Sequence, residues 1–223
     1  FLHFVLLPMG ILLMNYAFMK FILAVISYFN KIIIIVPEKI IIIDNDEKNR
    51  PQKSILSHSK ITIKSFGKNI FVNPAWNYGV EQSTTNKICI MNDDIEFDTT
   101  LFEKIDPYYE QEFGVIGLCP GESDFNQHPI TTGEIEILPW NNEHTYGFGC
   151  LMFINKLNWT PIPNELKVYF GDNFIFDRAL FTGKVNYLIT NMKFTSPFAT
   201  TTSDTSIVEG KLDKEYNIYM NII

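Results

Sequence analysis

Two clusters of acidic and amide side chains follow apolar runs and contain the residue types of a metal site. The first follows residues 88–91 and consists of Asn92, Asp93 and Asp94. The second follows residues 40–43 and consists of Asp44, Asn45 and Asp46. Adjacent carboxylates repel each other, and a divalent cation between them keeps both ionised. Because Asn and Asp are also common turn residues, a plain polar turn is the alternative at both places.

These clusters require buried strands that end at the same edge of a sheet. Residues 32–36 and 40–43 are unbroken β-branched runs, separated by residues 37–39, and such runs are typical of strands buried on both faces of a parallel sheet. Residues 60–64 alternate polar and apolar side chains and predict a further short strand. Ligands of open α/β sheets bind beyond the carboxyl ends of the strands, so we expect the two clusters to face one crevice.

Pro74 predicts the start of a helix, with Asn73 as its N-cap. Backbone N–H groups at such a start favour an anion. A second helix is predicted after Asp172, because apolar side chains recur there at helical spacing. An Asp at this place could be a simple N-cap, and a helix start would keep its carboxylate ionised.

An aromatic and polar loop before the apolar run 150–154 is the candidate sugar-binding surface. Aromatic faces stack on sugar rings, and glycines permit a close backbone approach. The candidate residues are Trp140, Tyr146, Gly147 and Gly149. The alternative is a polar surface loop with buried aromatic residues.

The order of these segments resembles the GT-A fold of family 2 glycosyltransferases. The resemblance covers roughly residues 39–179 and is carried by residues 40–45, 73–80, 88–95, 147–154 and 170–173. It implies an α/β fold with a mostly parallel central sheet flanked by helices, divided into a Rossmann-like nucleotide-binding half and an acceptor half. The implied activity is inverting transfer of a sugar, as in a hexosyltransferase, from a nucleotide-diphosphate sugar to a glycan, lipid or protein hydroxyl, in polysaccharide or glycan biosynthesis.

The resemblance also implies a role for each matching residue. Mn²⁺ or Mg²⁺ would be held by Asp94 and Asp93, and Asp172 would be the general base. The nucleotide sugar would be bound by Asp44, Asn45, Asn77, Gly79, Asn92 and Asp93. Three features depart from the family pattern. Asn92 stands at the first acidic position, Gly171 stands where a Glu precedes the base, and no histidine follows Asp172 to complete the shell of metal ligands. These departures keep a second hypothesis open, a non-catalytic or membrane-anchored sugar- or nucleotide-binding protein of the same fold.

The composition favours one domain in a reducing compartment. The chain has 223 residues, of which 46% are hydrophobic, enough for one sizeable core. Its formal net charge of -7 argues against a nucleic-acid partner, which requires surplus Lys and Arg. The three cysteines, Cys89, Cys119 and Cys150, show neither metal-ligand nor disulfide spacing, so we expect a cytoplasmic protein.

The single domain over residues 1–223 is expected to have four parts. Residues 39–100 form the nucleotide-sugar half, residues 101–194 the acceptor half, and residues 195–223 a loop followed by a helix from about residue 207. Residues 1–30 are strongly apolar. They predict a strand over residues 2–7 and a buried helix over about 12–29, or alternatively an anchor at the cytoplasmic face of a membrane.

Overall fold

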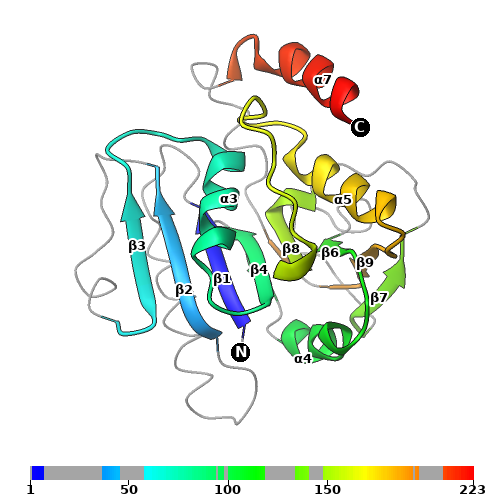
Figure 1. Cartoon of the computed structure of the whole chain (residues 1–223). Coiled ribbons are helices and arrows are strands. Elements are labelled where there is room, and N and C mark those ends of the chain that lie inside the picture. The colour runs from blue at the N-terminus through cyan, green and yellow to red at the C-terminus, as the bar shows by residue number, and fades with distance from the viewer. Residues whose placement is uncertain are drawn as a thin grey trace.

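The computed structural model describes residues 2–7, 37–45, 58–93, 95–97, 100–118, 134–140, 148–192, 194–195 and 208–223. Within these ranges a mixed sheet of eight strands has the order β3-β2-β1-β4-β8-β6-β9-β7 (Figure 1). The strands are β1 (Leu2–Leu7), β2 (Pro37–Asp44), β3 (Ile61–Ser65), β4 (Lys87–Asn92), β6 (Val115–Leu118), β7 (Glu136–Pro139), β8 (Leu151–Asn155) and β9 (Tyr187–Thr190).

The first half of the sheet is parallel, as the unbroken apolar runs predicted. Strand β1 lies between β2 and β4, and Leu6 pairs with both Ile42 and Met91. The predicted break at residues 37–39 is wrong, because Pro37 is the first residue of β2, where its missing N–H is tolerated. The register shift between Leu2 and His3 accommodates this start. The run 32–36 lies outside the described residues.

The second half of the sheet contains the antiparallel pairs. Strand β8 is antiparallel to both β4 and β6, β6 is parallel to β9, and β7 is antiparallel to β9. Met91 near the end of β4 pairs with Leu151 at the start of β8. The chain therefore enters β8 at the same sheet edge where β4 ends.

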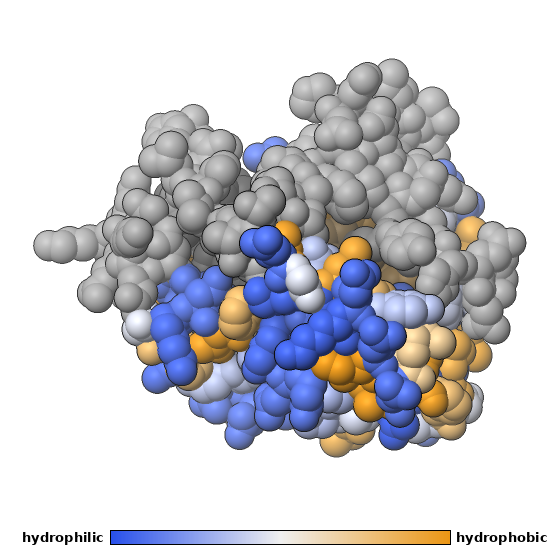
Figure 2. Space-filling model, turned by 90° about the horizontal axis from the view of Figure 1, so that it is seen from above, coloured by the Kyte–Doolittle hydropathy of each residue, from blue (hydrophilic) through white to orange (hydrophobic). Residues whose placement is uncertain are grey.

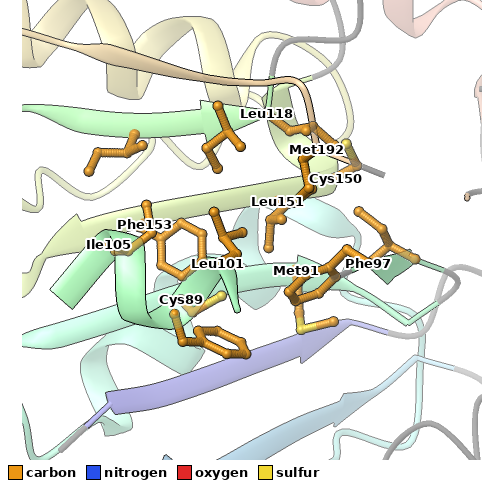
Figure 3. Packing of buried hydrophobic residues seen from close by; sticks show 14 of the residues in the cluster. Cys89, Met91, Phe97, Leu101, Ile105, Leu118, Cys150, Leu151, Phe153 and Met192 are labelled. Carbon is orange, nitrogen blue, oxygen red and sulfur yellow. The ribbon is translucent and has the colours of Figure 1, made fainter. Parts of the chain in front are cut away.

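Helices cover both faces of the sheet, which confirms the predicted α/β class. One face packs against α3 (Val72–Gln82), α5 (Gly171–Phe181) and α7 (Lys211–Ile222), which bury Trp76, Phe176 and Tyr219. The other face packs against α4 (Leu101–Ile105) and a two-stranded sheet made of β5 (Glu96–Phe97) and β10 (Phe194–Thr195). Figure 3 shows side chains of this second core layer.

The second core layer includes two cysteines, Cys89 and Cys150, which both lie buried (Figure 3). Burial raises the pKa of Cys89 well above its usual range, because a thiolate would lose its hydration there. Cys119 lies outside the described residues.

The helix boundaries differ from the sequence prediction at two places. Helix α3 begins at Val72, so Asn73 lies in its first turn and is not its N-cap. The reason is tertiary, because the Asn73 backbone N–H donates to Lys167 O at 3.1 Å and its Nδ2 donates to Tyr169 O at 3.1 Å. Helix α7 begins at Lys211, four residues later than predicted.

The predicted strand at the start of the chain is confirmed as β1. Residues 8–30, on which the choice between a buried helix and a membrane anchor depends, lie outside the described residues. Among the helices that the structure describes, none has the length and apolar character needed to cross a bilayer.

Candidate active site

The acidic strand ends lie at one edge of the parallel sheet, as predicted. Asp44 ends β2 and Asn92 ends β4, and only β1 separates these strands. Strands are about 4.8 Å apart, so the ends of β2 and β4 are about 10 Å apart. Asp44 is 5% exposed, whereas Asn92 and Asp93 are partly exposed. Figure 2 looks down on this edge and shows hydrophilic residues with hydrophobic patches among them.

Asp172 lies at the same edge, where it contacts the segment that precedes β8. Its Oδ2 accepts a hydrogen bond of 3.2 Å from Gly149 N, and Gly149 lies in the short helix η3 (Phe148–Cys150) directly before β8. Its Oδ1 accepts a bond of 3.0 Å from Asn173 N, in the first turn of α5. The predicted base and one predicted sugar-binding residue are therefore in direct contact beside the end of β4.

The electrostatic environment of Asp172 differs from the expectation for a helix start. Burial raises the pKa of its carboxyl, and the hydrogen bonds from the backbone N–H groups of Asn173 and Gly149 lower it by less. The side chain is nevertheless partly exposed. A carboxylate with a raised pKa accepts a proton more readily, which suits a general base.

Trp76 lies in the helix predicted after Pro74, and its sequence position did not mark it as a site residue. A Cβ atom on Gly149 would lie 2.8 Å from Trp76 Cη2 and 3.6 Å from Asp172 Oδ2. Only glycine fits between the two side chains without a shift. Trp76 is 3% exposed, and its Nε1 has no hydrogen-bond partner among the described residues. A Trp in a helix carries no sequence signal that separates this contact from ordinary core packing.

The unusual Gly171 also has a structural reason. A Cβ atom on residue 171 would lie 2.1 Å from Asn73 Oδ1, and Asn73 is fully buried. The side chain of Asn73 from α3 thus occupies the space that any larger residue before Asp172 would need. The departure from the family pattern at this position is therefore coupled to the identity of residue 73.

Two amides predicted to bind the nucleotide sugar contact the protein backbone. Asn77 Nδ2 donates to Ile162 O at 2.8 Å, and its Oδ1 accepts from Ile162 N at 2.9 Å. Asn45 Oδ1 accepts from Ile70 N at 3.2 Å, and its Nδ2 donates to Phe71 O at 3.5 Å. Asn45 thus holds the chain before α3, Asn77 holds the chain after β8, and Gly79 is buried within α3. Their contacts with a nucleotide sugar stay predictions.

Trp140 packs against the core and is half-buried. Its ring meets Phe148 and Phe176 edge-on, with centroid distances of 6.0 Å and 5.5 Å. Its backbone N–H donates to Asn186 O at 2.8 Å. A sugar contact of Trp140 stays a prediction, and Tyr146 and Gly147 lie outside the described residues.

The residues at the end of β4 fit a divalent cation by their donor chemistry. Asn92 and Asp93 offer partly exposed oxygen atoms, which Mg²⁺ and Mn²⁺ prefer. The described part of the chain contains no group of three or more His, Cys, Asp or Glu side chains that would enclose an ion. Such a site suits an ion held by one or two carboxylates and by substrate phosphates. Asp94, the main predicted ligand, lies outside the described residues.

Solved structures share the fold of this chain at low sequence identity. Staphylococcus aureus TarS 1-349 has 11% identity and a TM-score of 0.60, over 87% of this chain and 60% of that one. GalNAc-T7, solved with UDP, GalNAc and Mn²⁺, has 12% identity and a TM-score of 0.61, over 97% and 50%. The inositol-1-phosphate CTP transferase from T. maritima has 10% identity and a TM-score of 0.54, over 93% and 96%. The chain thus spans 60% of TarS 1-349 and half of GalNAc-T7.

Because a nucleotidyltransferase shares this fold, the fold alone does not separate sugar transfer from nucleotidyl transfer. Comparison with curated protein sequences gave no match. The family profile described as Glycosyl transferase family 2 matches residues 33–182, a range that contains Asp44, Asn92, Gly149 and Asp172. With this profile covering about two thirds of its length, the chain belongs to glycosyl transferase family 2 and has an α/β fold of the GT-A type.

Proposed function

We propose that the chain transfers a sugar from a nucleotide-diphosphate sugar to an acceptor hydroxyl, with inversion and with Asp172 as the general base. The observation that supports this most is the contact between Asp172 and Gly149 at the sheet edge where β4 ends. In this contact, a partly exposed carboxylate whose pKa is raised by burial lies at the same sheet edge as the candidate diphosphate site.

In this proposal each part of the edge has one task. Asp44 at the end of β2 binds the base or ribose of the donor, and Asn92 and Asp93 at the end of β4 lie beside its diphosphate. Asp172 removes the proton from the acceptor hydroxyl while that oxygen attacks the anomeric carbon and the nucleoside diphosphate leaves. The N–H groups of Gly149 and Asn173 orient the carboxylate.

Asp93 and Asp94 are the residues that would hold Mn²⁺ or Mg²⁺. A bound cation would offset the negative charge that develops on the leaving diphosphate. Since structures of similar fold were solved with UDP, or with UDP, GalNAc and Mn²⁺, UDP-sugars with and without Mn²⁺ are the first donors to screen, followed by GDP- and dTDP-sugars. Once a donor is found, glycans, lipids and proteins can be compared as acceptors by the rate at which nucleoside diphosphate is released.

Asp172→Asn tests the proposal, with Asp213→Asn as a control at an exposed position on α7. Loss of a general base lowers turnover by about 10²–10⁴-fold, while donor binding measured by calorimetry stays unchanged. Equal turnover of Asp172→Asn and the wild type would remove Asp172 from the mechanism. A chain that binds UDP-sugars but never releases nucleoside diphosphate from them would instead be a sugar-binding protein.

A further inference from the structure

The segment directly before Asp172, residues 167–170, is held from two sides. From α3, the backbone N–H of Asn73 donates to Lys167 O and its side chain donates to Tyr169 O. From α7, Glu215 Oε2 accepts hydrogen bonds from Val168 N at 3.0 Å and from Tyr169 N at 2.8 Å. The backbone that leads into the predicted base is thus fixed by a residue 46 positions further along the chain.

Glu215 is a carboxylate that is only 2% exposed. Burying such a group is unfavourable unless it is hydrogen-bonded, and bonds from N–H groups to a carboxylate are stronger than bonds between neutral groups. Both backbone N–H groups meet one oxygen, so the position of that oxygen determines the path of residues 168 and 169. The burial of Glu215 and the geometry of this segment therefore depend on each other.

Helix α7 also contacts Phe170, the last residue of this segment. Phe170 has a left-handed backbone, with φ 59°, which is unfavourable for a residue with a side chain. Its ring stacks on Tyr219, with a centroid distance of 5.2 Å and an interplanar angle of 13°. Tyr219 lies one turn after Glu215 and its hydroxyl donates to Asp177 of α5. Figure 1 shows α7 lying beside the start of α5.

We propose that Glu215 is a positioning residue for Asp172. Its carboxylate fixes the backbone of Val168 and Tyr169, and this fixed path sets where α5 begins and where the Asp172 carboxylate lies against Gly149 N. The inference rests on the proposed role of Asp172 as the base. Glu215 itself contacts backbone groups rather than reacting atoms, so it acts through Asp172.

The test compares three variants in the full chain. Glu215→Met keeps the length and helix preference of the side chain and removes the acceptor, whereas Glu215→Gln keeps one acceptor oxygen. Asp213→Ala removes an exposed carboxylate of the same helix and serves as the control. Because small displacements of reacting groups cost up to about 10²-fold in rate, we expect Glu215→Met to lower kcat about 10–100-fold at nearly constant KM for the donor. Glu215→Gln and Asp213→Ala should stay close to the wild type.

A double variant separates positioning from a general loss of structure. If Glu215 acts through Asp172, Glu215→Met should lower the residual rate of Asp172→Asn little further. An equal fold-loss in both backgrounds, or a Glu215→Met kcat equal to that of Asp213→Ala, would overturn the proposal.

Hydrogen exchange of the wild type provides a readout that needs neither activity nor a folded variant. The amides of Val168 and Tyr169 should be protected, although they lie outside helices and strands, and fast exchange of both would overturn the proposed contact. A wrong assignment of Asp172 as the base would give another result. Asp172→Asn would then leave turnover unchanged, while the amides of Val168 and Tyr169 would still be protected.

Discussion

The indole ring of Trp76 lies so close to Gly149 that a Cβ atom on residue 149 would approach ring atom Cη2 to 2.8 Å. Trp76 is 3% exposed and packs in the core between α3 and the sheet, so the ring has little room to shift. The same glycine donates its N–H to Asp172. A core contact and a candidate catalytic contact therefore meet at one backbone position.

Gly149→Ala should lower both stability and turnover. An inserted methyl group in a packed core costs about 1–3 kcal/mol of unfolding free energy, and it displaces the N–H that contacts Asp172. Urea unfolding and steady-state kinetics measure the two effects. Trp76→Phe shortens the facing ring, so in that background Gly149→Ala should cost less. An equal cost in both backgrounds would show that the ring is not the obstacle.

The raised pKa of Asp172 predicts a specific pH dependence of stability. The pKa of Asp172 is higher in the folded than in the unfolded state. The free energy of unfolding therefore falls as pH rises from the pKa of the unfolded state to the pKa of the folded state. Asp172→Asn removes this ionisation. The stability of the variant relative to the wild type should therefore rise as pH increases from about 4, the usual pKa of an aspartate, through the raised pKa of Asp172. A difference that is constant over this range, measured by thermal unfolding, would contradict the assigned environment.

The same ionisation predicts the acid limb of the rate profile. A general base must be ionised, so kcat/KM should fall as pH falls through the pKa of Asp172. Burial places this limb above the range of an ordinary aspartate. An activity that declines only at the pH of an exposed aspartate would indicate that Asp172 is solvated in the working enzyme.

Asp94→Ala should abolish the dependence of donor binding on Mn²⁺. This prediction comes from the order of residues after β4, since Asp94 itself lies outside the described residues. Calorimetry of UDP binding with Mn²⁺ and with EDTA measures it, and Glu96→Ala, at an exposed position in β5, is the control. Equal affinity of the wild type with and without the ion would reject a metal at this edge.

Asn77→Ala should destabilise the fold through the loss of two hydrogen bonds to Ile162. Leaving buried backbone groups without partners costs about 1–3 kcal/mol each, so a clear fall in urea midpoint is expected. Donor affinity measured on the same variant tests the nucleotide contact that family resemblance implies. Asn221→Ala, which loses an exposed bond within α7, should leave the midpoint nearly unchanged.

The strands and the order of the site were predictable because their signals are local. The runs before Asp44 and Asn92 were long enough to indicate buried strands, and both acidic ends lie at one sheet edge as expected. The start of α3 was not predictable, because it is fixed by hydrogen bonds from the backbone and side chain of Asn73 to the carbonyl groups of Lys167 and Tyr169. The role of Glu215 was not predictable either. Its partners are backbone N–H groups, which nearly every residue has, so the sequence does not show which of them it contacts.

Strand β5 continues from the acidic end of β4 and pairs with β10, where Phe97 is opposite Phe194. Almost a hundred residues separate these partners, so their pairing closes a long loop and is expected to form late in folding. Strands β2 and β3 pair across a much shorter loop, with Ile42 opposite Ile63, so this part of the sheet can form before the candidate diphosphate site has its final support. During refolding, burial of the core should therefore be detected before donor binding returns.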